Sequence, residues 1–236
     1  MTSRREPAIN EPAIEVLYED NHILVIVKPV NIPTQEDSSG DPDLLSLLKA
    51  DLKIRHNKPG NVFLGLVHRL DRPVGGVMVF AKTSKAASRL SDQVRTRLLD
   101  KTYTAVVHGS VTPSQGRLKH YLLKDNRTNT VRAVSSHTSG AKEALLDYTL
   151  LDQREGLSLI KVNLITGRPH QIRVQWATQG HPLYGDQRYG QRLAKPGQQI
   201  ALWASELAFD HPTQKTRLSF RSSPPQRAPW TLWASL

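Results

Sequence analysis

Short apolar runs separated by charged or glycine-containing turns predict strands in the first half of the chain. The run at 22–27 has the length of a buried strand and follows a shorter apolar segment at 16–18. Apolar runs at 62–67 and 77–81 predict two further buried strands, and the run at 103–107 predicts another. The first half of the chain is therefore expected to be rich in strands.

Apolar residues at helical spacing interrupt these strands at two places. A leucine-rich segment predicts a short helix over 44–54, after a polar loop at 34–43. A second helix begins at Thr83 or Ser84, where a hydroxyl can cap it, and extends to about Leu99. The expected apolar face of this second helix consists of Ala86, Ala87, Leu90, Val94 and Leu98.

The second half of the chain predicts longer strands and one more helix. Residues 116–137 indicate a basic hairpin with a polar turn at 125–129. A third helix opens within 166–170, with a proline at an early position, and ends at Gly180. Further strands are expected near 144–151, 157–165, 200–209 and 216–220. The whole pattern predicts an α+β fold with a mixed, mainly antiparallel sheet flanked by helices and loops.

Hydrophobic patterning also predicts a simple domain organisation, and no repeat or low-complexity tract interrupts the chain. Residues 1–14 carry little hydrophobic patterning and are expected to form a flexible arm, whereas 15–236 are expected to form a single domain. No apolar run approaches the ~18 residues of a membrane span. The absence of cysteine excludes disulfides, thiolate metal sites and a cysteine nucleophile, and it favours a reducing, cytoplasmic setting. The nine histidines are scattered, so no metal site is predicted.

Charge is distributed unevenly along the chain. The total of 32 Lys and Arg against 21 Asp and Glu gives a formal charge of +11. Residues 1–60 hold 7 basic and 10 acidic residues, a net charge of −3, whereas 61–236 hold 25 and 11, a net charge of +14. A concentrated positive field favours a polyanion, so nucleic acid is the expected partner. A solvated basic surface with no such partner is the alternative.

A charged, glycine-ended loop lies between the predicted strands at 62–67 and 77–81. Its sequence over 68–76 is His-Arg-Leu-Asp-Arg-Pro-Val-Gly-Gly, and loops of this kind between buried strands often carry function. This loop resembles the signature loop of the RluA-type pseudouridine synthases. Other segments resemble further blocks of that family in the same order, and together with the loop they span about 15–210. These blocks are Lys28-Pro29, 101–107, 166–173 and 180–186.

The resemblance implies the pseudouridine synthase fold and the isomerisation of uridine to pseudouridine in transfer or ribosomal RNA. It implies that the glycosidic bond is cleaved, that the uracil turns, and that its carbon 5 is joined to the sugar. No cofactor or metal is implied. The small RNA-binding module that precedes the catalytic domain in many relatives is not expected here, so RNA recognition falls to the catalytic domain. No protein partner or membrane is implied, and a monomer is expected.

Such chemistry requires a carboxylate near the sugar and the base, and Asp71 is the candidate. Its alternative role is a structural ion pair with Arg69 or Arg72. As the catalytic group it could attack the sugar, add to the base or remove a sugar proton, and the sequence leaves these three open. A carboxylate in a pocket of low polarity needs a cation, and the resemblance assigns this role to Arg173. The resemblance also implies that Arg69 fills the space left by a flipped uridine and that Tyr103 stacks on the uracil.

The expected RNA-binding residues lie mainly on the basic hairpin. They are Lys119, Lys124, Arg127 and Arg132, together with Arg168 from the later block. The chain departs from the commonest family pattern at 72–76, at Gln175 and at 31–35, and these departures bear on substrate choice more than on catalysis. One competing hypothesis is a non-catalytic RNA-binding protein or RNA chaperone on the same fold. Another is a glycosidase or nucleosidase, but the signature loop offers one carboxylate where such enzymes use a pair.

Overall fold

A computed structural model describes residues 14–233 of the chain, so the predicted arm at 1–14 lies almost entirely outside the described residues. Its strands are β1 (Glu15–Glu19), β2 (Ile23–Lys28), β3 (Gly65–Leu66), β4 (Gly75–Ala81), β5 (Asp100–His108), β6 (Gln115–Asp125), β7 (Thr130–Val134), β8 (Lys142–Arg154), β9 (Leu157–Leu164), β10 (Leu202–Asp210) and β11 (Arg217–Arg221). Its α-helices are α1 (Leu44–Arg55), α2 (Ser84–Thr96) and α3 (Gln171–Thr178), and two short 3₁₀ helices are η1 (Gln191–Leu193) and η2 (Trp230–Trp233).

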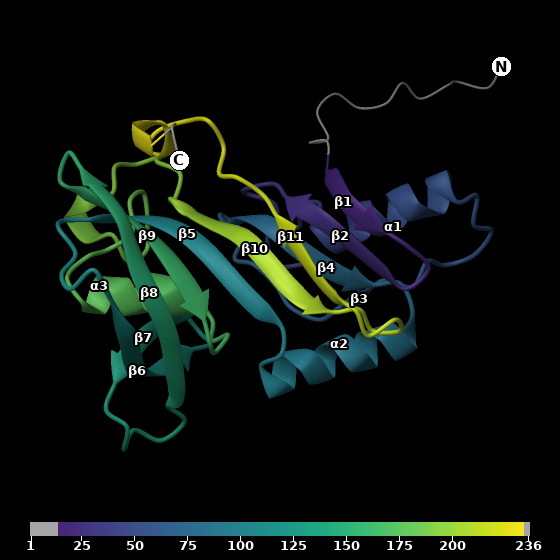
Figure 1. The fold of residues 1–236 in the computed structure, drawn as a ribbon, viewed down its shortest axis with the longest axis horizontal. Helices are drawn as coiled ribbons and strands as arrows, with labels where there is room; N and C mark the ends of the chain where they lie inside the picture. The colour runs from purple at the N-terminus through teal and green to yellow at the C-terminus, as the bar shows by residue number, and fades with distance from the viewer. Residues whose placement is uncertain (1–13, 234–236) are drawn as a thin grey trace.

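All of these strands belong to one sheet, in the order β1-β2-β4-β10-β5-β9-β8-β6-β7. β11 pairs with β10 and β3 pairs with β4, both beside this main path. The strand pairs are antiparallel except β10 with β4, so the α+β fold with a mainly antiparallel sheet is as predicted. β5 and β10 run between two halves of the molecule (Figure 1). One half contains β1–β4 with α1 and α2, and the other contains β6–β9 with α3.

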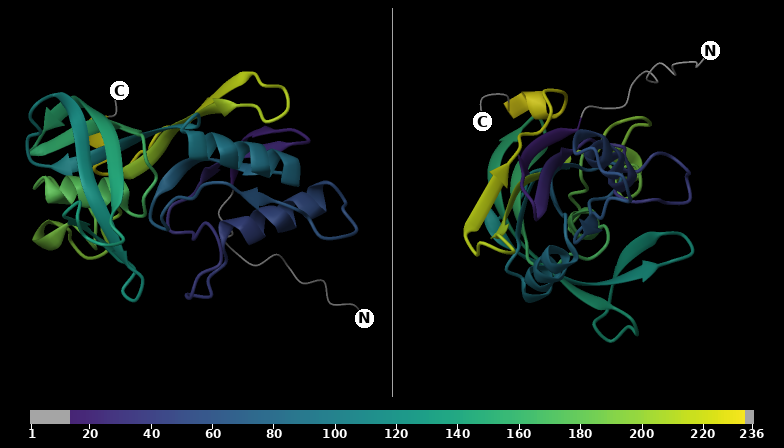
Figure 2. Two further views of the ribbon diagram at one scale, coloured as in Figure 1. Left: turned by 90° about the horizontal axis from the view of Figure 1, so that it is seen from below. Right: turned by 90° about the vertical axis from the view of Figure 1, so that its right-hand side faces the viewer.

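The central strands of the first half are apolar throughout because both faces of the sheet are covered. Side chains at alternate positions of β2 and β4 point to opposite faces, so Leu24 and Met78 belong to one buried cluster while Val25 and Val79 belong to another. α1 covers the first face and α2 covers the second. α3 packs Ile172 and Trp176 onto the same cluster as α1, so these two helices share a face of the strongly twisted sheet (Figure 2).

Two predicted elements are shorter than expected. α2 stops at Thr96 because Arg97 adopts a left-handed conformation with φ of 62°, and its backbone N–H donates to the carbonyls of Gln93 and Val94 to close the last turn. Leu98, predicted to lie on the buried face of that helix, is instead 53% exposed. The strand predicted at 62–67 is reduced to β3, Gly65–Leu66.

Because β3 is short, a long loop over 67–74 connects it to β4 and contains Asp71. Beyond Leu66 the chain leaves the sheet, and the His68 side chain takes the place of a strand by accepting a hydrogen bond from the Val79 N–H at Nε2, 3.1 Å away. At the other end of the loop, Gly76 has a φ of 121° where β4 pairs with β10. A Cβ on Gly76 would lie 2.2 Å from the Ala204 carbonyl oxygen, so glycine is required there.

Candidate active site

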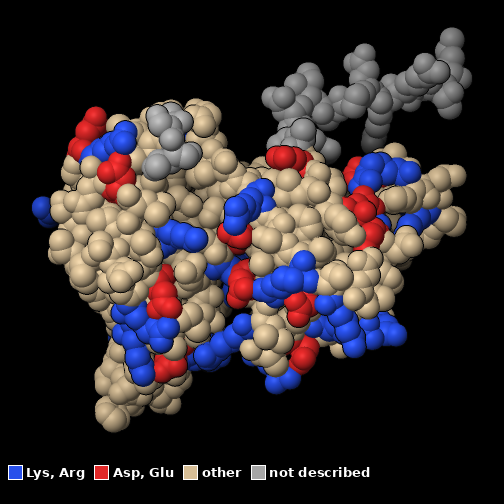
Figure 3. Space-filling view, viewed as in Figure 1, with Lys and Arg blue, Asp and Glu red and all other residues tan. Residues whose placement is uncertain are grey.

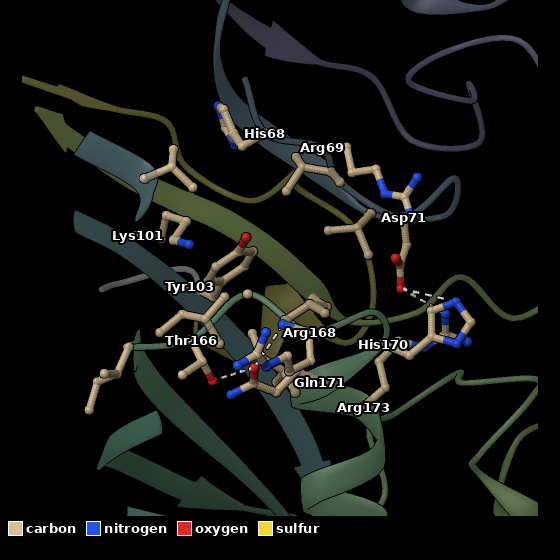
Figure 4. A pocket seen from close by; sticks show the side chains of 18 of the residues that line it. His68, Arg69, Asp71, Lys101, Tyr103, Thr166, Arg168, His170, Gln171 and Arg173 are labelled. Carbon is tan, nitrogen blue, oxygen red and sulfur yellow. Dashed lines mark hydrogen bonds and ion pairs between the residues drawn. The ribbon is translucent and has the colours of Figure 1, made fainter. Parts of the chain in front are cut away.

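The loop after β3 forms one wall of a cleft of about 550 Å³. The end of α2, the start of β5 and the connection from β9 to α3 supply the other walls (Figure 4). Polar lining residues include His68, Arg69, Asp71, Lys101, Tyr103, Thr166, Arg168, His170, Gln171 and Arg173. The cleft is therefore lined by all four residues predicted for the chemistry or its support: Arg69, Asp71, Tyr103 and Arg173.

Asp71 is held through one of its two carboxylate oxygens. Arg173 Nη1 donates to Asp71 Oδ2 at 3.0 Å, and His170 Nε2 lies 3.9 Å from the same oxygen. Within residues 14–233, Oδ1 has no hydrogen-bond partner, and neither Arg69 nor Arg72 pairs with Asp71. The Asp71 side chain is 27% exposed at the cleft wall, and because Oδ2 is taken by Arg173, Oδ1 is the oxygen left for a bound molecule.

Arg173 is fixed by a second carboxylate that sequence analysis gave no role. Its Nε and Nη2 donate to the two oxygens of Asp186, each at 2.8 Å. Burial alone would raise the pKa of Asp186, but the Arg173 guanidinium and the N–H groups of Tyr189 and Arg188 lower it below its usual value. The guanidinium therefore has a rigid support on one side and presents Nη1 to Asp71 on the other.

Tyr103 lies in the middle of β5, between Val162 of β9 and Ala204 of β10. It is 7% exposed, and its ring lines the cleft. Burial, together with the Asp71 carboxylate, raises the pKa of Tyr103 well above its usual value. The side chain is thus a neutral phenol whose flat ring forms part of the cleft floor.

Two basic side chains line the cleft away from Asp71. Burial lowers the pKa of Lys101, and in the described part of the chain its amino group has no hydrogen-bond or ion-pair partner. Arg168 donates from Nε to the Glu143 carbonyl at 2.8 Å, which orients its guanidinium along the wall. Sequence analysis placed Lys101 within a family block without a role, whereas Arg168 was expected to contact RNA.

Lys28 is hydrogen-bonded to the backbone of the loop that carries Asp71. Its side chain is fully buried, and Nζ donates to the carbonyls of Val74, Pro29 and Arg72 at 2.8, 3.0 and 3.1 Å. Burial lowers the pKa of Lys28 to about 7, while the Asp71 carboxylate opposes this shift. The lysine therefore ties the end of β2 to the backbone on the far side of Asp71.

A second cavity, of about 740 Å³, lies on the other side of Asp71. Arg69 lines both cavities and is exposed, and within 14–233 it has no hydrogen-bond or ion-pair partner. Arg72 joins two of the segments that depart from the family pattern: its Nε donates to the Asn31 carbonyl, and its own carbonyl accepts from the Asn31 N–H. These departures therefore meet in one wall of the second cavity.

The residues predicted to bind RNA do not form one surface. Lys124 lines the second cavity, and Arg127 lies in the exposed turn between β6 and β7. Lys119 alternates to the other face of β6 and pairs with Glu143 at 3.1 Å. Arg132 is exposed and follows the buried Val131, so it also points away from Lys124. The hairpin thus presents one of its four predicted residues to a cavity at the candidate site.

Gln175, the third departure from the family pattern, lies outside both cavities. It is fully buried, and its Nε2 donates to the Leu118 and Ala144 carbonyls at 3.1 and 3.2 Å. These contacts tie α3 to β6 and β8. Its contacts in the structure are those of a packing residue, and its bearing on substrate choice stays a prediction.

Sequence reasoning missed several residues around the ion pair, although all lie in or beside the family blocks. They are Lys28, Lys101, His170, Asp186 and Tyr189. Their signal was the recurrence of charged or aromatic residues in blocks whose other members already had roles. Over residues 14–233, no group of three or more potential metal ligands is gathered. Within the same range, no helix has the length and apolar character to cross a membrane.

Comparison with known proteins gives a family for this arrangement. Residues 22–178 match the family described as RNA pseudouridylate synthase. The chain is 33% identical to ribosomal large subunit pseudouridine synthase D of Zymomonas mobilis, covering 93% of this chain and 73% of that protein. It is also 35% identical to an uncharacterized RNA pseudouridine synthase of Bacillus subtilis, covering 84% of this chain and 65% of the relative.

A relative from Mycoplasma pneumoniae gives a similar result, with 34% identity over 89% of this chain and 66% of the relative, so the chain spans slightly less than two thirds of such relatives. Among solved structures, human RNA pseudouridylate synthase domain containing 4 superposes with a TM-score of 0.75 and 25% identity, covering 90% of this chain and 89% of that one. The fold, the ordered motifs and these matches agree. The chain belongs to the RNA pseudouridylate synthase family, in its RluA-type branch.

Proposed function

We propose that the protein converts a specific uridine in structured RNA, transfer or ribosomal, to pseudouridine. The Asp71 carboxylate carries this proposal. It is the only carboxylate among the described residues that line the 550 Å³ cleft, and its Oδ1 is free while Arg173 holds Oδ2. The positive charge of Arg173 offsets the desolvation free energy of the partly buried Asp71 carboxylate. A single, fixed carboxylate suits isomerisation at one sugar better than hydrolysis by a carboxylate pair.

The proposed reaction keeps all atoms of the nucleotide. The bond from C1′ to N1 breaks, the uracil turns, and a bond forms from C1′ to C5. C5 then loses its hydrogen as a proton and N1 gains one, so the composition is unchanged and no cofactor takes part. Asp71 Oδ1 acts at the sugar or the base, either as the nucleophile or as the proton acceptor.

The uridine must leave its stack to reach Asp71, at a cost of a few kcal/mol. The cleft has the size of an ordinary small-molecule site, ~300–1,000 Å³. In the proposal, the Tyr103 ring stacks on the flipped uracil, and Arg69, which borders both cavities, fills the vacated position in the RNA.

The second cavity would hold nucleotides that flank the target. Lys124, Arg69 and Arg188 line it and supply positive charge for phosphates, while Arg168 and Lys101 do so along the first cleft. On the face shown in Figure 3, Lys and Arg side chains lie mainly along the lower part of the view, interspersed with Asp and Glu. In the proposal, RNA contacts the basic residues that line the two cavities, because the basic residues elsewhere on this face are interspersed with acidic ones.

The candidate RNAs follow from the relatives. Relatives are named ribosomal large subunit pseudouridine synthase C or D, so large-subunit ribosomal RNA is the first RNA to examine, followed by transfer RNA. Pseudouridine mapping of both RNAs from cells with and without the protein identifies the target. We further propose that the protein acts as a monomer in the cytoplasm, without an obligate protein partner.

The test uses RNA labelled with tritium at C5 of uridine, because isomerisation releases this tritium to water. Asp71→Asn keeps the size of the side chain but removes its charge, so tritium release should fall below about one percent of the parent rate while RNA affinity is unchanged. Asp147→Asn is the matched control, because Asp147 pairs with Arg117 on the surface and lies outside both cavities. This control should retain the parent rate.

Three results would contradict the proposal. Turnover by Asp71→Asn above about one percent would remove the carboxylate from the chemistry. Release of free uracil by the parent would indicate a nucleosidase. Tight RNA binding by the parent with no tritium release from any cellular RNA would leave the non-catalytic RNA-binding protein as the function.

A further inference from the structure

Tyr189 makes contacts on three sides next to the candidate site. Its hydroxyl oxygen lies 2.9 Å from the Val131 nitrogen and accepts that N–H, and it lies 2.7 Å from His170 Nδ1. The Arg173 guanidinium carbon lies over its ring, 5.1 Å from the centroid. The residue therefore touches β7 of the hairpin and both of the side chains that face Asp71 Oδ2.

The hydrogen bonds at this hydroxyl decide where the proton of His170 lies. Because the oxygen already accepts the Val131 N–H, its own hydrogen is free to point at His170 Nδ1. Neutral histidine then carries its proton on Nε2. In the opposite arrangement, Nδ1 would donate to the tyrosine, and among the described residues no other acceptor is within hydrogen-bond distance of the Tyr189 hydroxyl.

His170 is the kind of histidine for which the tautomer matters. Its side chain is 11% exposed, and the charged groups around it are Asp71, Arg173, Arg188 and Asp186. Burial lowers the pKa of His170, Arg173 and Arg188 lower it further, and the two carboxylates oppose the shift. The ring is therefore neutral near pH 7, and one of its nitrogens is a donor while the other is an acceptor.

We propose that Tyr189 is a positioning residue that keeps the proton of His170 on Nε2, so that this N–H faces Asp71 Oδ2. The nitrogen and the oxygen are 3.9 Å apart, so the contact is electrostatic rather than a formed hydrogen bond. With Arg173 Nη1 on the same oxygen, two donors point at Oδ2 and leave Oδ1 toward the substrate. The other tautomer would direct a lone pair at the carboxylate and push it out of this orientation.

The assignment concerns the free protein, and only its effect on rate rests on the proposed function. The test is the ¹⁵N spectrum of the histidine rings without RNA, with the His170 signals assigned by their loss in His170→Gln. In the parent, Nε2 should have the shift of a protonated nitrogen and Nδ1 that of an unprotonated one. The reverse pattern in the parent would overturn the proposal whatever the activity of the protein.

The carboxylate of Asp71 also favours a proton on Nε2, so it must be removed to isolate the effect of Tyr189. In Asp71→Asn, Tyr189 alone should keep His170 in a single tautomer. In the double variant Asp71→Asn with Tyr189→Phe, both ring nitrogens should move to intermediate shifts, as expected for a mixture of tautomers. Identical spectra for the single and double variants would overturn the role of Tyr189.

The rate measurement separates positioning from packing. Tyr189→Phe keeps the ring over Arg173 but loses the hydrogen bond that orients the His170 ring toward Asp71. The single-turnover rate at saturating RNA should therefore fall about tenfold even though Asp71 still favours a proton on Nε2, because this is the effect of roughly one hydrogen bond. RNA affinity should change less than twofold. Tyr184→Phe is the matched control, since the Tyr184 hydroxyl accepts from Gln198 and contacts none of these residues. An unchanged rate in Tyr189→Phe, or an equal loss in Tyr184→Phe, would contradict the positioning role.

An inactive parent protein would reject the proposed function but leave the tautomer assignment standing. Conversely, an active parent with the proton on Nδ1 would reject the inference and leave the function. The spectra and the rates therefore test the two statements separately.

Discussion

Arg69 stands at the boundary between the two cavities, two residues before Asp71. It is exposed, and within residues 14–233 it has no hydrogen-bond or ion-pair partner, unlike Arg72 and Arg173. An arginine without a partner in the protein is free to meet the RNA. Its flat guanidinium can stack on bases and form paired hydrogen bonds, whereas the ammonium of lysine cannot.

We therefore expect Arg69→Lys to slow the reaction at least about tenfold on a folded stem-loop, where flipping a uridine breaks stacking that costs a few kcal/mol. The loss should be much smaller on an unpaired oligomer with the same local sequence. Single-turnover rates on both RNAs measure this difference. Equal fractional losses would show that Arg69 contacts phosphate instead of filling the gap.

Residue chemistry implied the need for an ion pair at the centre of the site, and the family resemblance supplied its two members. A lone aspartate in a charged loop implied a compensating cation, and the structure pairs Asp71 with Arg173, 102 positions later in the chain. The sequence did not indicate that Asp186 would hold the other edge of the same guanidinium. A bidentate contact depends on the relative placement of α3 and the loop after it, which local patterns do not encode.

At the scale of elements, the Asp71 loop depends on β2 through one side chain. Lys28→Met would leave the carbonyls of Pro29 and Val74 without a donor, while the Arg72 carbonyl keeps the Asn31 N–H, and each unsatisfied buried group costs about 1–3 kcal/mol. We expect a loss of about 3 kcal/mol in the free energy of unfolding, measured by urea denaturation. Lys85→Met, an exposed position on α2, is the control and should change stability by less than about 0.5 kcal/mol. A similar stability for both variants would mean that the three contacts contribute little.

The β6–β7 hairpin allows a comparison between its two faces. Lys124 lines the second cavity, whereas Lys119 pairs with Glu143 on the opposite face. Lys124→Ala should weaken RNA binding and lower the slope of log affinity against log salt by roughly 0.7–0.9, the value for one phosphate contact. Lys119→Ala should leave the slope unchanged. If both changes lower the slope equally, RNA wraps both faces, as the predicted set of hairpin residues implied.

Elements were predictable where burial repeats along the strand, and less so where the chain leaves the sheet. The apolar runs of β2 and β4 gave the right strands because both faces of the sheet are covered. The run at 62–67 has the same composition, but the His68 side chain replaces the backbone as the partner of Val79. Likewise, the left-handed Arg97 ends α2 although the apolar spacing continues to Leu98.

At the scale of the whole molecule, His68 links acidity to stability. Burial, together with Lys101, lowers the pKa of His68 from 6.5 to about 3 in the folded protein. Below pH 6.5 the unfolded chain takes up a proton that the folded one does not, so this group's contribution is complete above pH 6.5 and is lost as the pH falls toward 3. At pH 5 the loss is about 2 kcal/mol.

We expect the free energy of unfolding to fall more between pH 7.5 and pH 5.0 in the parent than in His68→Gln, which cannot take up the proton. Urea denaturation at both pH values measures the difference. His137→Gln, at an exposed loop position, should keep the pH dependence of the parent. If His68→Gln loses as much stability on acidification as the parent does, His68 does not contribute to this pH dependence.

The order of the strands in the sheet delays the assembly of the site during synthesis of the chain. β10 lies between β4 and β5 in the sheet, yet it is synthesised after both strands and after both Asp71 and Arg173. The growing chain must keep this position in the sheet open until residue 210 has emerged from the ribosome. Long-range pairings of this kind form late because the closure of a long loop precedes any gain from the contact. We therefore expect the loop and the helix to remain apart in a nascent chain on the RNA-rich ribosome, and to close into one site only when β10 is available.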